Sequence, residues 1–299
     1  MRFFYPDVPD MPLPEGHRFP ASKYRLLHER VVRDTLLGSA ALLPSPVAPS
    51  ERLLRAHGAA YVDMMLTGTA PADMMRRIGL PWSETLIARS RATVGGSLAA
   101  ARAALEHGIS GQLAGGTHHA HGDFGSGYCV FNDLAVASLT LLDEGAVQRI
   151  AIVDLDVHQG DGNAAILTPD PRVFVLSIHG EKNFPFRKVA SDLDVGLPDG
   201  TEDAAYLAAL RGALDAAVAF KPDLVLYLSG ADPLAADTLG RLSLTAAGLM
   251  QRDRIVFETF KRRGVPLSIA IGGGYAEPIS LTVEGYANTF GAARDVYGF

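Results

Sequence analysis

Residues 150–162, with the sequence IAIVDLDVHQGDG, join an apolar run to a cluster of side chains that can bind metal. Because side chains alternate along a strand, we expect Asp154, Asp156 and His158 to point to one face of a strand over Ile150–Val157. Asp161 adds a third acid shortly after. Buried carboxylates are costly unless they are paired or bound to a metal. The segment therefore predicts a divalent metal site.

The composition limits the class of protein. The chain has 299 residues, of which 48% are hydrophobic and 20% charged, so we expect one large core and a single domain over residues 1–299. The formal net charge of −6 indicates no basic surface that could bind a nucleic-acid phosphate backbone, so we expect no direct nucleic-acid binding. No apolar run is long enough to span a membrane and the N-terminus carries no signal-peptide core, which predicts a cytoplasmic protein.

The chain has one cysteine, Cys129. A single thiol forms no internal disulfide and no thiolate-cluster metal site. Any metal ligands must therefore be oxygen and imidazole. Cys129 itself is expected to be a buried, unreactive thiol.

Short apolar runs alternate with helical stretches along the chain. This alternation is typical of βαβ units, so we expect an α/β fold with a mostly parallel sheet and helices on both faces. Ser50 is a candidate N-cap, and the Pro- and Gly-rich stretches Pro6–Gly16 and Leu43–Pro49 predict surface loops. The expected strands are Arg2–Tyr5, Gly111–Ala114, Ile150–Val157, Val173–Ile178, Leu224–Leu228 and Pro266–Ile271. The expected helices are Ser22–Gly38, Ser50–Thr67, Ser83–His107, Asn132–Glu144, Glu202–Phe220, Thr245–Arg263 and Glu277–Val296.

Polar or glycine-rich segments follow four of these runs. In open parallel sheets, ligands bind beyond the carboxyl ends of the strands, so these segments should converge at one edge. Each segment alone is a weaker signal, because glycine runs also form ordinary turns. The four segments are Gly115–His119, Asp154–Gly162, Ser229–Pro233 and Gly272–Tyr275.

Asp156, His158 and Asp232 form a candidate ligand set of two carboxylates and one imidazole. Three protein ligands leave an open position, as catalytic zinc requires, although the same set also suits ferrous iron. A metal with an open position activates water and polarises a carbonyl, which indicates hydrolysis of an amide or ester. The alternatives are a turn role for Asp232 before Pro233 and a buried structural role for His158.

His118 and His119 are adjacent, so they cannot both point to one metal without a bend in the backbone. We interpret them instead as a general base and its electrostatic partner, each oriented by a carboxylate. Asp154 and Asp161 are the acids left over for this task. The phenol of Tyr275 is a candidate donor to an oxyanion, and the alternative is a buried aromatic that packs against its loop.

Several separate motifs together resemble the histone deacetylase family, which has the arginase-deacetylase fold. The HQGDG form, the ADPLAADTLGRLSLT stretch and the short length are most similar to class IV histone deacetylases and their bacterial relatives. Weaker similarity extends through residues 14–24, 55–66 and 199–210. The segments that carry the resemblance are GGTHHAHGDFGSGYCVFND (115–133), VDLDVHQGDGN (153–163), GADPLAADTLGRLSL (230–244) and GGGYA (272–276).

This resemblance implies an eight-stranded, mostly parallel sheet in a single catalytic domain. It implies Zn²⁺ on Asp156, His158 and Asp232, with His119 as the main general base and acid and His118 as its electrostatic partner. It pairs Asp154 with His118 and Asp161 with His119, and it assigns the oxyanion to Tyr275.

The resemblance also implies a monovalent cation and an acyl tunnel. The cation, usually K⁺, would be bound by Asp154, by main-chain oxygens of Asp156 and His158, and by the hydroxyl of Ser177. The tunnel would be formed by Gly127, Tyr128, Phe184 and Gly273, and Tyr128 replaces the usual phenylalanine.

The function that the resemblance implies is zinc-dependent removal of acetyl or longer acyl groups from lysine side chains in proteins or peptides, through a metal-activated water. One alternative is deacetylation of acetylpolyamines or other small N-acyl amines. A binuclear manganese ureohydrolase would need the order Asp-x-His-x-Asp, whereas this chain has Asp154-x-Asp156-x-His158. A further alternative is a non-catalytic protein that binds acyl-lysine, although His118, His119 and Tyr275 are all retained. The oligomeric state stays open.

Overall fold

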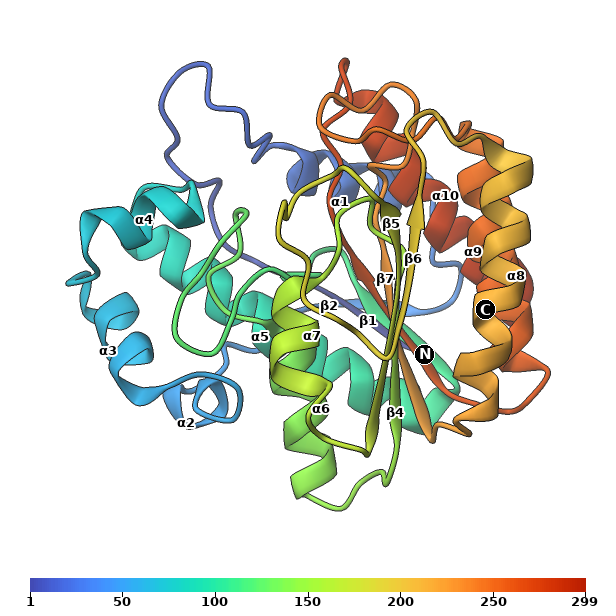
Figure 1. Ribbon diagram of the computed structural model, residues 1–299, viewed down its shortest axis with the longest axis horizontal. Coiled ribbons are helices and arrows are strands. Elements are labelled where there is room, and N and C mark those ends of the chain that lie inside the picture. The colour runs from blue at the N-terminus through green and yellow to red at the C-terminus, as the bar shows by residue number, and fades with distance from the viewer.

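The computed structural model describes residues 1–299, and its centre is an open sheet of eight strands in which every pairing is parallel (Figure 1). The strand order is β2-β1-β3-β8-β7-β4-β5-β6. This sheet confirms the predicted α/β class. The strands are β1 Arg2–Tyr5, β2 Ala41–Pro44, β3 Ile109–Gln112, β4 Ile150–Asp154, β5 Val173–Gly180, β6 Leu193–Leu197, β7 Leu224–Ser229 and β8 Leu267–Ile271.

Helices cover both faces of the sheet. One face packs against α1, α8, α9 and α10, and the other packs against the layer that contains α5 and α6 (Figure 1). None of the helices is both long and apolar enough to cross a membrane. The helices are α1 Lys23–Arg33, α2 Ser50–Leu53, α3 Ala59–Thr67, α4 Ala72–Ile78, α5 Glu84–His107, α6 Asp133–Asp143, α7 Asp161–Leu167, α8 Asp203–Ala219, α9 Ala246–Lys261 and α10 Ser280–Tyr297.

Strand β4 shows why the central strands are continuously apolar in sequence. Ala151 and Val153 pack into the core on one face of the sheet, whereas Ile150 and Ile152 pack into the core on the other. A strand that is buried on both faces needs apolar side chains in both directions. This double burial explains why the runs could be recognised as strands without polar alternation.

The expected extension of this strand to Val157 is wrong. β4 ends at Asp154, and Asp156 and His158 lie in the loop before α7. The loop, and not the alternation of side chains along a strand, therefore determines the positions of these two side chains. The expected strand Gly111–Ala114 is also displaced, because β3 spans Ile109–Gln112.

Both edge strands were missed from the sequence. β2 overlaps the stretch Leu43–Pro49 that was expected to be a loop, and β6 received no prediction. Most residues of β2 are exposed, and in β6 partly buried and exposed positions alternate as far as the buried Leu197. An edge strand needs no continuous apolar run, so neither segment carries the signal that identified the inner strands.

The expected helix Ser50–Thr67 is wrong as one element. It is divided into α2 and α3, with Gly58 in extended backbone ahead of α3 and its N–H bonded to the carbonyl of Gly122. Ser50 is not the cap, because Pro49 occupies that position. The short helices α4 and α7 were not predicted, since seven residues carry little periodic pattern.

The strand order determines where the four polar segments lie. They follow β3, β8, β7 and β4, and these four strands are consecutive neighbours in the sheet. All strands are parallel, so the carboxyl ends of all four open at the same edge. The segments 115–119, 272–275, 229–233 and 154–162 are therefore brought side by side.

A buried arginine connects two of these segments. Arg252 of α9 is 1% exposed, and its guanidinium donates to the carbonyl oxygens of Gly230 (2.6 Å) and Leu155 (3.2 Å) and to Asp253 (2.9 Å). The two carbonyls lie one and two residues before Asp156 and Asp232. Arg252 thus fixes the backbone of both carboxylate-bearing loops.

We expect Arg252→Met to lower the free energy of unfolding by about 3–5 kcal/mol, because it leaves Asp253 as an uncompensated buried charge. Urea unfolding followed by circular dichroism measures the change. Arg254→Met is the matched control, since Arg254 pairs with Asp295 at the surface and should cost less than about 1 kcal/mol. Equal losses in the two variants would contradict the role of Arg252.

Candidate active site

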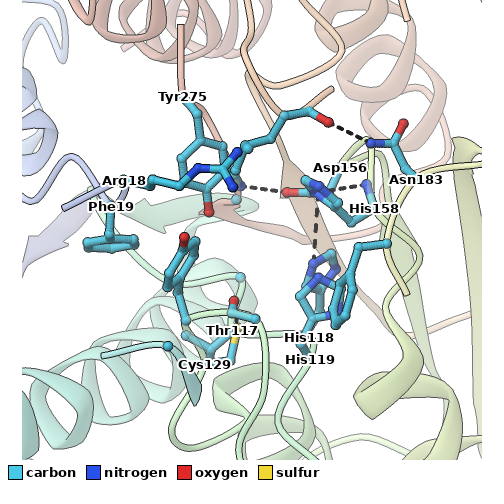
Figure 2. Close-up of a pocket in the computed structure, with 18 of the residues that line it drawn as sticks. Arg18, Phe19, Thr117, His118, His119, Cys129, Asp156, His158, Asn183 and Tyr275 are labelled. Atoms are coloured by element: carbon cyan, nitrogen blue, oxygen red, sulfur yellow. Dashed lines mark hydrogen bonds and ion pairs between the residues drawn. The ribbon is translucent and has the colours of Figure 1, made fainter. Parts of the chain in front are cut away.

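A cavity of about 450 Å³ opens at the carboxyl edge of the sheet (Figure 2). His118, His119, Asp156, His158 and Tyr275 all line it. Figure 2 shows the phenol of Tyr275 on one side of the cavity and the imidazoles of His118 and His119 on the other. Polar groups that converge in a concave, partly apolar pocket are typical of an enzyme active site.

Asp156, His158 and Asp232 come together at the base of the cavity. One ligand atom from each lies within 4.8 Å of the others, and all three residues are buried. The Nδ1 atom of His158 lies 2.9 Å from Asp156 and 3.1 Å from Asp232. Asp232 is fully buried and also accepts a hydrogen bond from the N–H of Val157, so it is not a surface turn residue.

The close packing of this cluster depends on glycine. A Cβ atom at Gly273 would lie 1.9 Å from a carboxylate oxygen of Asp232. The N–H of Gly273 donates to Asp156. The glycine-rich segment after β8 therefore lets the backbone approach the two carboxylates directly.

The charges of the cluster favour a bound cation. Burial alone would lower the pKa of His158, but hydrogen bonds to Asp156 and Asp232 raise it to about 10. Burial and the charge of Asp156 raise the pKa of Asp232 to about 7. The two buried carboxylates thus stabilise positive charge beside them. A divalent ion would supply that charge in place of the proton on His158, so the residues fit a metal.

Two histidine–carboxylate pairs flank this cluster. The Nδ1 atom of His118 lies 2.8 Å from Asp154, and the Nδ1 atom of His119 lies 2.6 Å from Asp161. The ring centroids of the two histidines are 4.1 Å apart. The hydrogen bond to Asp161 assigns the proton of His119 to Nδ1, which leaves Nε2 free to accept a proton from the cavity.

The two histidines differ in their pKa. Burial lowers the pKa of His118, but the charges of Asp154 and Asp156 outweigh burial and raise it to about 9. Burial and the neighbouring charge of His118 lower the pKa of His119 to about 4. His118 is therefore the charged member and His119 the neutral member, and such a division is typical of an acid–base site.

His121 adds to this arrangement in a way that the sequence did not indicate. Its Nε2 atom lies 3.0 Å from the second oxygen of Asp161, so one carboxylate holds both His119 and His121. These hydrogen bonds lower the pKa of Asp161 despite its burial. Asp161 consequently stays ionised and able to orient His119.

Asp133 supports the loop that carries the histidines and was also missed. Its carboxylate accepts hydrogen bonds from the N–H groups of Gly116 (3.1 Å) and Thr117 (2.8 Å) and from the Thr117 hydroxyl (2.6 Å). Asp133 is fully buried at the first turn of α6. Asp133 is the last residue of the motif 115–133, and this position in the motif could have indicated its supporting role.

Tyr275 is held by its backbone and not by its hydroxyl. Its N–H donates to Asp237 (2.6 Å), and its carbonyl accepts from the Thr238 hydroxyl (2.9 Å). The phenol makes no hydrogen bond within the chain. Burial, together with the charges of Asp156 and Asp232, raises the pKa of Tyr275 well above its usual value. The phenol therefore keeps its proton and is free to donate to a substrate.

The four predicted tunnel residues all line the cavity: Gly127, Tyr128, Phe184 and Gly273. The ring of Phe184 lies edge-on to His119 with 4.9 Å between centroids. A Cβ atom at Gly127 would lie 2.6 Å from the His119 ring, so only glycine fits there. Cys129 is buried, and burial raises the pKa of its thiol, as expected of an unreactive cysteine.

Ser177, the remaining predicted site residue, is buried beside Asp154. The register of β4 and β5 places these two residues opposite each other. Its hydroxyl lies 3.0 Å from Nδ1 of His179. Ser177 and Asp154 therefore lie side by side on neighbouring strands.

Lys23 was not recognised from the sequence, yet it contacts Tyr275. It is 1% exposed, and its ammonium lies 4.8 Å from the centre of the Tyr275 ring and 3.3 Å from the carbonyl oxygen of Gly274. The rings of Phe19, Tyr24 and Tyr286 also surround it. Cation–π contacts strengthen when they are desolvated, so Lys23 helps to hold the Tyr275 loop in place.

We expect Lys23→Met to lower kcat by about 10- to 100-fold with little change in KM, because it releases the Gly274–Tyr275 backbone from its position. Steady-state kinetics of amide hydrolysis measures the change. Lys261→Met is the matched control, since Lys261 also lies over a tyrosine ring, Tyr297, at the surface. Unchanged kcat in a folded Lys23→Met protein would contradict this role.

Comparisons with known proteins agree on one family. A model of the histone deacetylase domain matches residues 17–288. The chain is 45% identical to an uncharacterized protein of Picosynechococcus sp. over 98% of both chains. It is 30% identical to histone deacetylase 2 of Arabidopsis thaliana, covering 90% of this chain and 72% of that protein. It is 29% identical to the acetoin utilization protein AcuC of Staphylococcus aureus, covering 79% of this chain and 67% of that protein.

Proposed function

The chain belongs to the histone deacetylase family and is a hydrolase of the deacetylase type, and we propose that it removes acetyl or longer acyl groups from lysine side chains in proteins or peptides. The observation that carries this proposal is the shared cavity of Asp156, His158, the His119–Asp161 pair and Tyr275. We also propose that residues 1–299 form one catalytic domain and that it groups with the class IV members of the family.

We assign the metal to Asp156, His158 and Asp232 and propose that it is Zn²⁺, with Fe²⁺ as the alternative for the same ligands. When bound, the ion supplies Lewis acidity, which polarises the substrate carbonyl and lowers the pKa of a water molecule. Two observations support this assignment: both carboxylates are buried, and their hydrogen bonds raise the pKa of His158. K⁺ is assigned to Asp154, Ser177 and the main-chain oxygens of Asp156 and His158.

His119 acts as the general base and then as the general acid. Its free Nε2 atom takes a proton from the attacking water and later gives it to the departing lysine amine, while Asp161 keeps the ring oriented. Charged His118, held by Asp154, keeps His119 neutral before reaction. The amide and water are thus converted into a carboxylic acid and a free amine, and His119 returns to its initial protonation state.

Tyr275 stabilises the charge that develops on the carbonyl oxygen. Its protonated phenol lies free on the opposite wall from the histidines and donates a hydrogen bond to this oxygen. Phe184 and Tyr128 enclose the acyl-lysine stem and keep water away from it.

A panel of acyl-lysine peptides tests this proposal. Acetyl, butanoyl, octanoyl and longer acyl groups on one peptide are incubated with metal-loaded protein, and release of free lysine is followed by mass spectrometry. We expect turnover with at least one acyl length. No turnover with any of them would contradict the proposal, and binding without turnover would indicate the non-catalytic alternative.

Acetylpolyamines and other small N-acyl amines are the second candidate substrates. The same catalytic residues would serve them, since the amide bond that is hydrolysed is the same. Parallel assays with acetylputrescine and acetylspermidine distinguish the two classes by kcat/KM.

A further inference from the structure

The mouth of the cavity carries four basic side chains, which we call the basic rim: Arg18, Arg77, Lys182 and Arg241. They come from four separate parts of the chain, namely the segment before α1, the end of α4, the segment after β5 and the segment after β7. All four are exposed. Figure 2 shows the side chain of Arg18 directed toward the middle of the cavity.

Acidic side chains are scarce around the basic rim. The only carboxylate that lines the cavity is Asp156, which lies at the base in the metal cluster. Asp199 approaches Arg241 (3.1 Å) and Lys182 (3.9 Å), so one acid is shared by two cations. Arg18 has no carboxylate partner, and Arg77 stacks on the ring of Phe124 at 4.5 Å. The rim therefore keeps a positive charge.

This positive charge is local. The whole chain has a formal net charge of −6, so the rim does not reflect a basic protein. Elsewhere on the surface, Arg25 pairs with Asp10 and Glu29, and Arg262 pairs with Glu258. A cleft with one sign of charge at its mouth concentrates the field there and attracts ligands of the opposite sign.

An exposed aromatic side chain belongs to the same mouth. Phe186 also lines the cavity and is 86% exposed, far more than the other large apolar side chains at the surface. Its ring lies edge-on to that of Phe184. An aromatic surface beside cations suits an extended peptide that places apolar and acidic groups around the reacting residue.

We propose that the basic rim selects acyl-lysine residues flanked by aspartate or glutamate, and that it disfavours acetylpolyamines and basic peptides. This inference rests on the proposed function. The acylated lysine is neutral and enters the cavity without a charge penalty. Flanking carboxylates stay at the mouth, where Arg18 and Arg77 are free to pair with them. The free ammonium groups of an acetylpolyamine would lie against the same cations.

Three acetyl-lysine peptides that differ only at the two residues on each side of the lysine test this inference. The flanks are acidic, neutral or basic, and acetylspermidine is a fourth substrate. We expect kcat/KM to be about three- to tenfold higher for the acidic than for the neutral peptide, mostly through KM, and lower for the basic peptide and acetylspermidine. Raising NaCl from about 0.02 M to about 0.5 M should reduce the preference.

The double variant Arg18→Gln, Arg77→Gln should lose most of the preference, measured as the ratio of kcat/KM for the acidic peptide to kcat/KM for the neutral peptide. Arg211→Gln, an exposed arginine on α8, is the matched control and should keep the preference. Equal kcat/KM for the three peptides, a preference that persists in the double variant, or a higher value for acetylspermidine would overturn the inference. No turnover of any peptide would instead contradict the proposed function.

Discussion

Replacing His119 by alanine should lower kcat on an acyl-lysine peptide by about 100- to 10,000-fold, the usual loss when a general acid–base residue is removed. His119 is the neutral histidine of the pair, its Nδ1 is held by Asp161 at 2.6 Å, and its Nε2 is free toward the cavity. Of the three histidines that line the cavity, His118, His119 and His158, only His119 has a lowered pKa. Steady-state kinetics with metal-loaded protein measures the loss.

His107→Ala is the control for this variant, because His107 lies at the surface where α5 ends. It should leave kcat unchanged. Asp161→Asn should show a smaller loss than His119→Ala, since it removes the orienting group and keeps the imidazole. A kcat of His119→Ala within tenfold of the wild-type value would contradict this role and indicate that another residue transfers the proton.

Tyr275→Phe should lower kcat by about 100- to 1000-fold and leave KM nearly unchanged, because the lost hydrogen bond forms only as charge develops on the carbonyl oxygen. The phenol has no partner within the chain, so its removal leaves no broken hydrogen bond behind. The folded structure should therefore be unaffected, and thermal unfolding of the variant checks this point.

Tyr297→Phe on α10 serves as the control, since Tyr297 lies away from the cavity and its hydroxyl also lacks a partner. Its kcat should equal that of the wild type. A parallel loss of binding and turnover in Tyr275→Phe, measured by titration with a substrate analogue, would contradict the oxyanion role and indicate that the phenol holds the substrate before reaction.

The sequence predicted the inner sheet because burial on both faces leaves a continuous apolar run, as in β4 and β7. It did not predict β2 and β6, which lie at the edges and need no such run. The prediction also extended β4 to Val157, because the spacing of two between Asp154, Asp156 and His158 continues beyond the end of the strand. Local pattern alone does not show where a strand leaves its sheet.

The candidate site was predicted from residue types that are costly to bury without a partner, such as Asp154, Asp156 and His158. The supporting residues were missed because their roles depend on contacts across the sheet. Lys23 lies 251 residues from Gly274, whose carbonyl it contacts, and Arg252 lies 97 residues from Leu155. A lysine or arginine in an amphipathic helix is normally solvated, so the sequence pattern gives no sign of burial.

We propose that one divalent ion, held by Asp156, His158 and Asp232, makes this chain an amide hydrolase. The most direct test strips the protein of metal, adds Zn²⁺ in steps, and measures bound metal by elemental analysis and acyl-lysine turnover on the same samples. We expect turnover to be absent without metal, to rise in proportion to metal occupancy and to reach its maximum at one ion per chain. Full turnover in stripped protein, or a maximum that requires two ions, would contradict it.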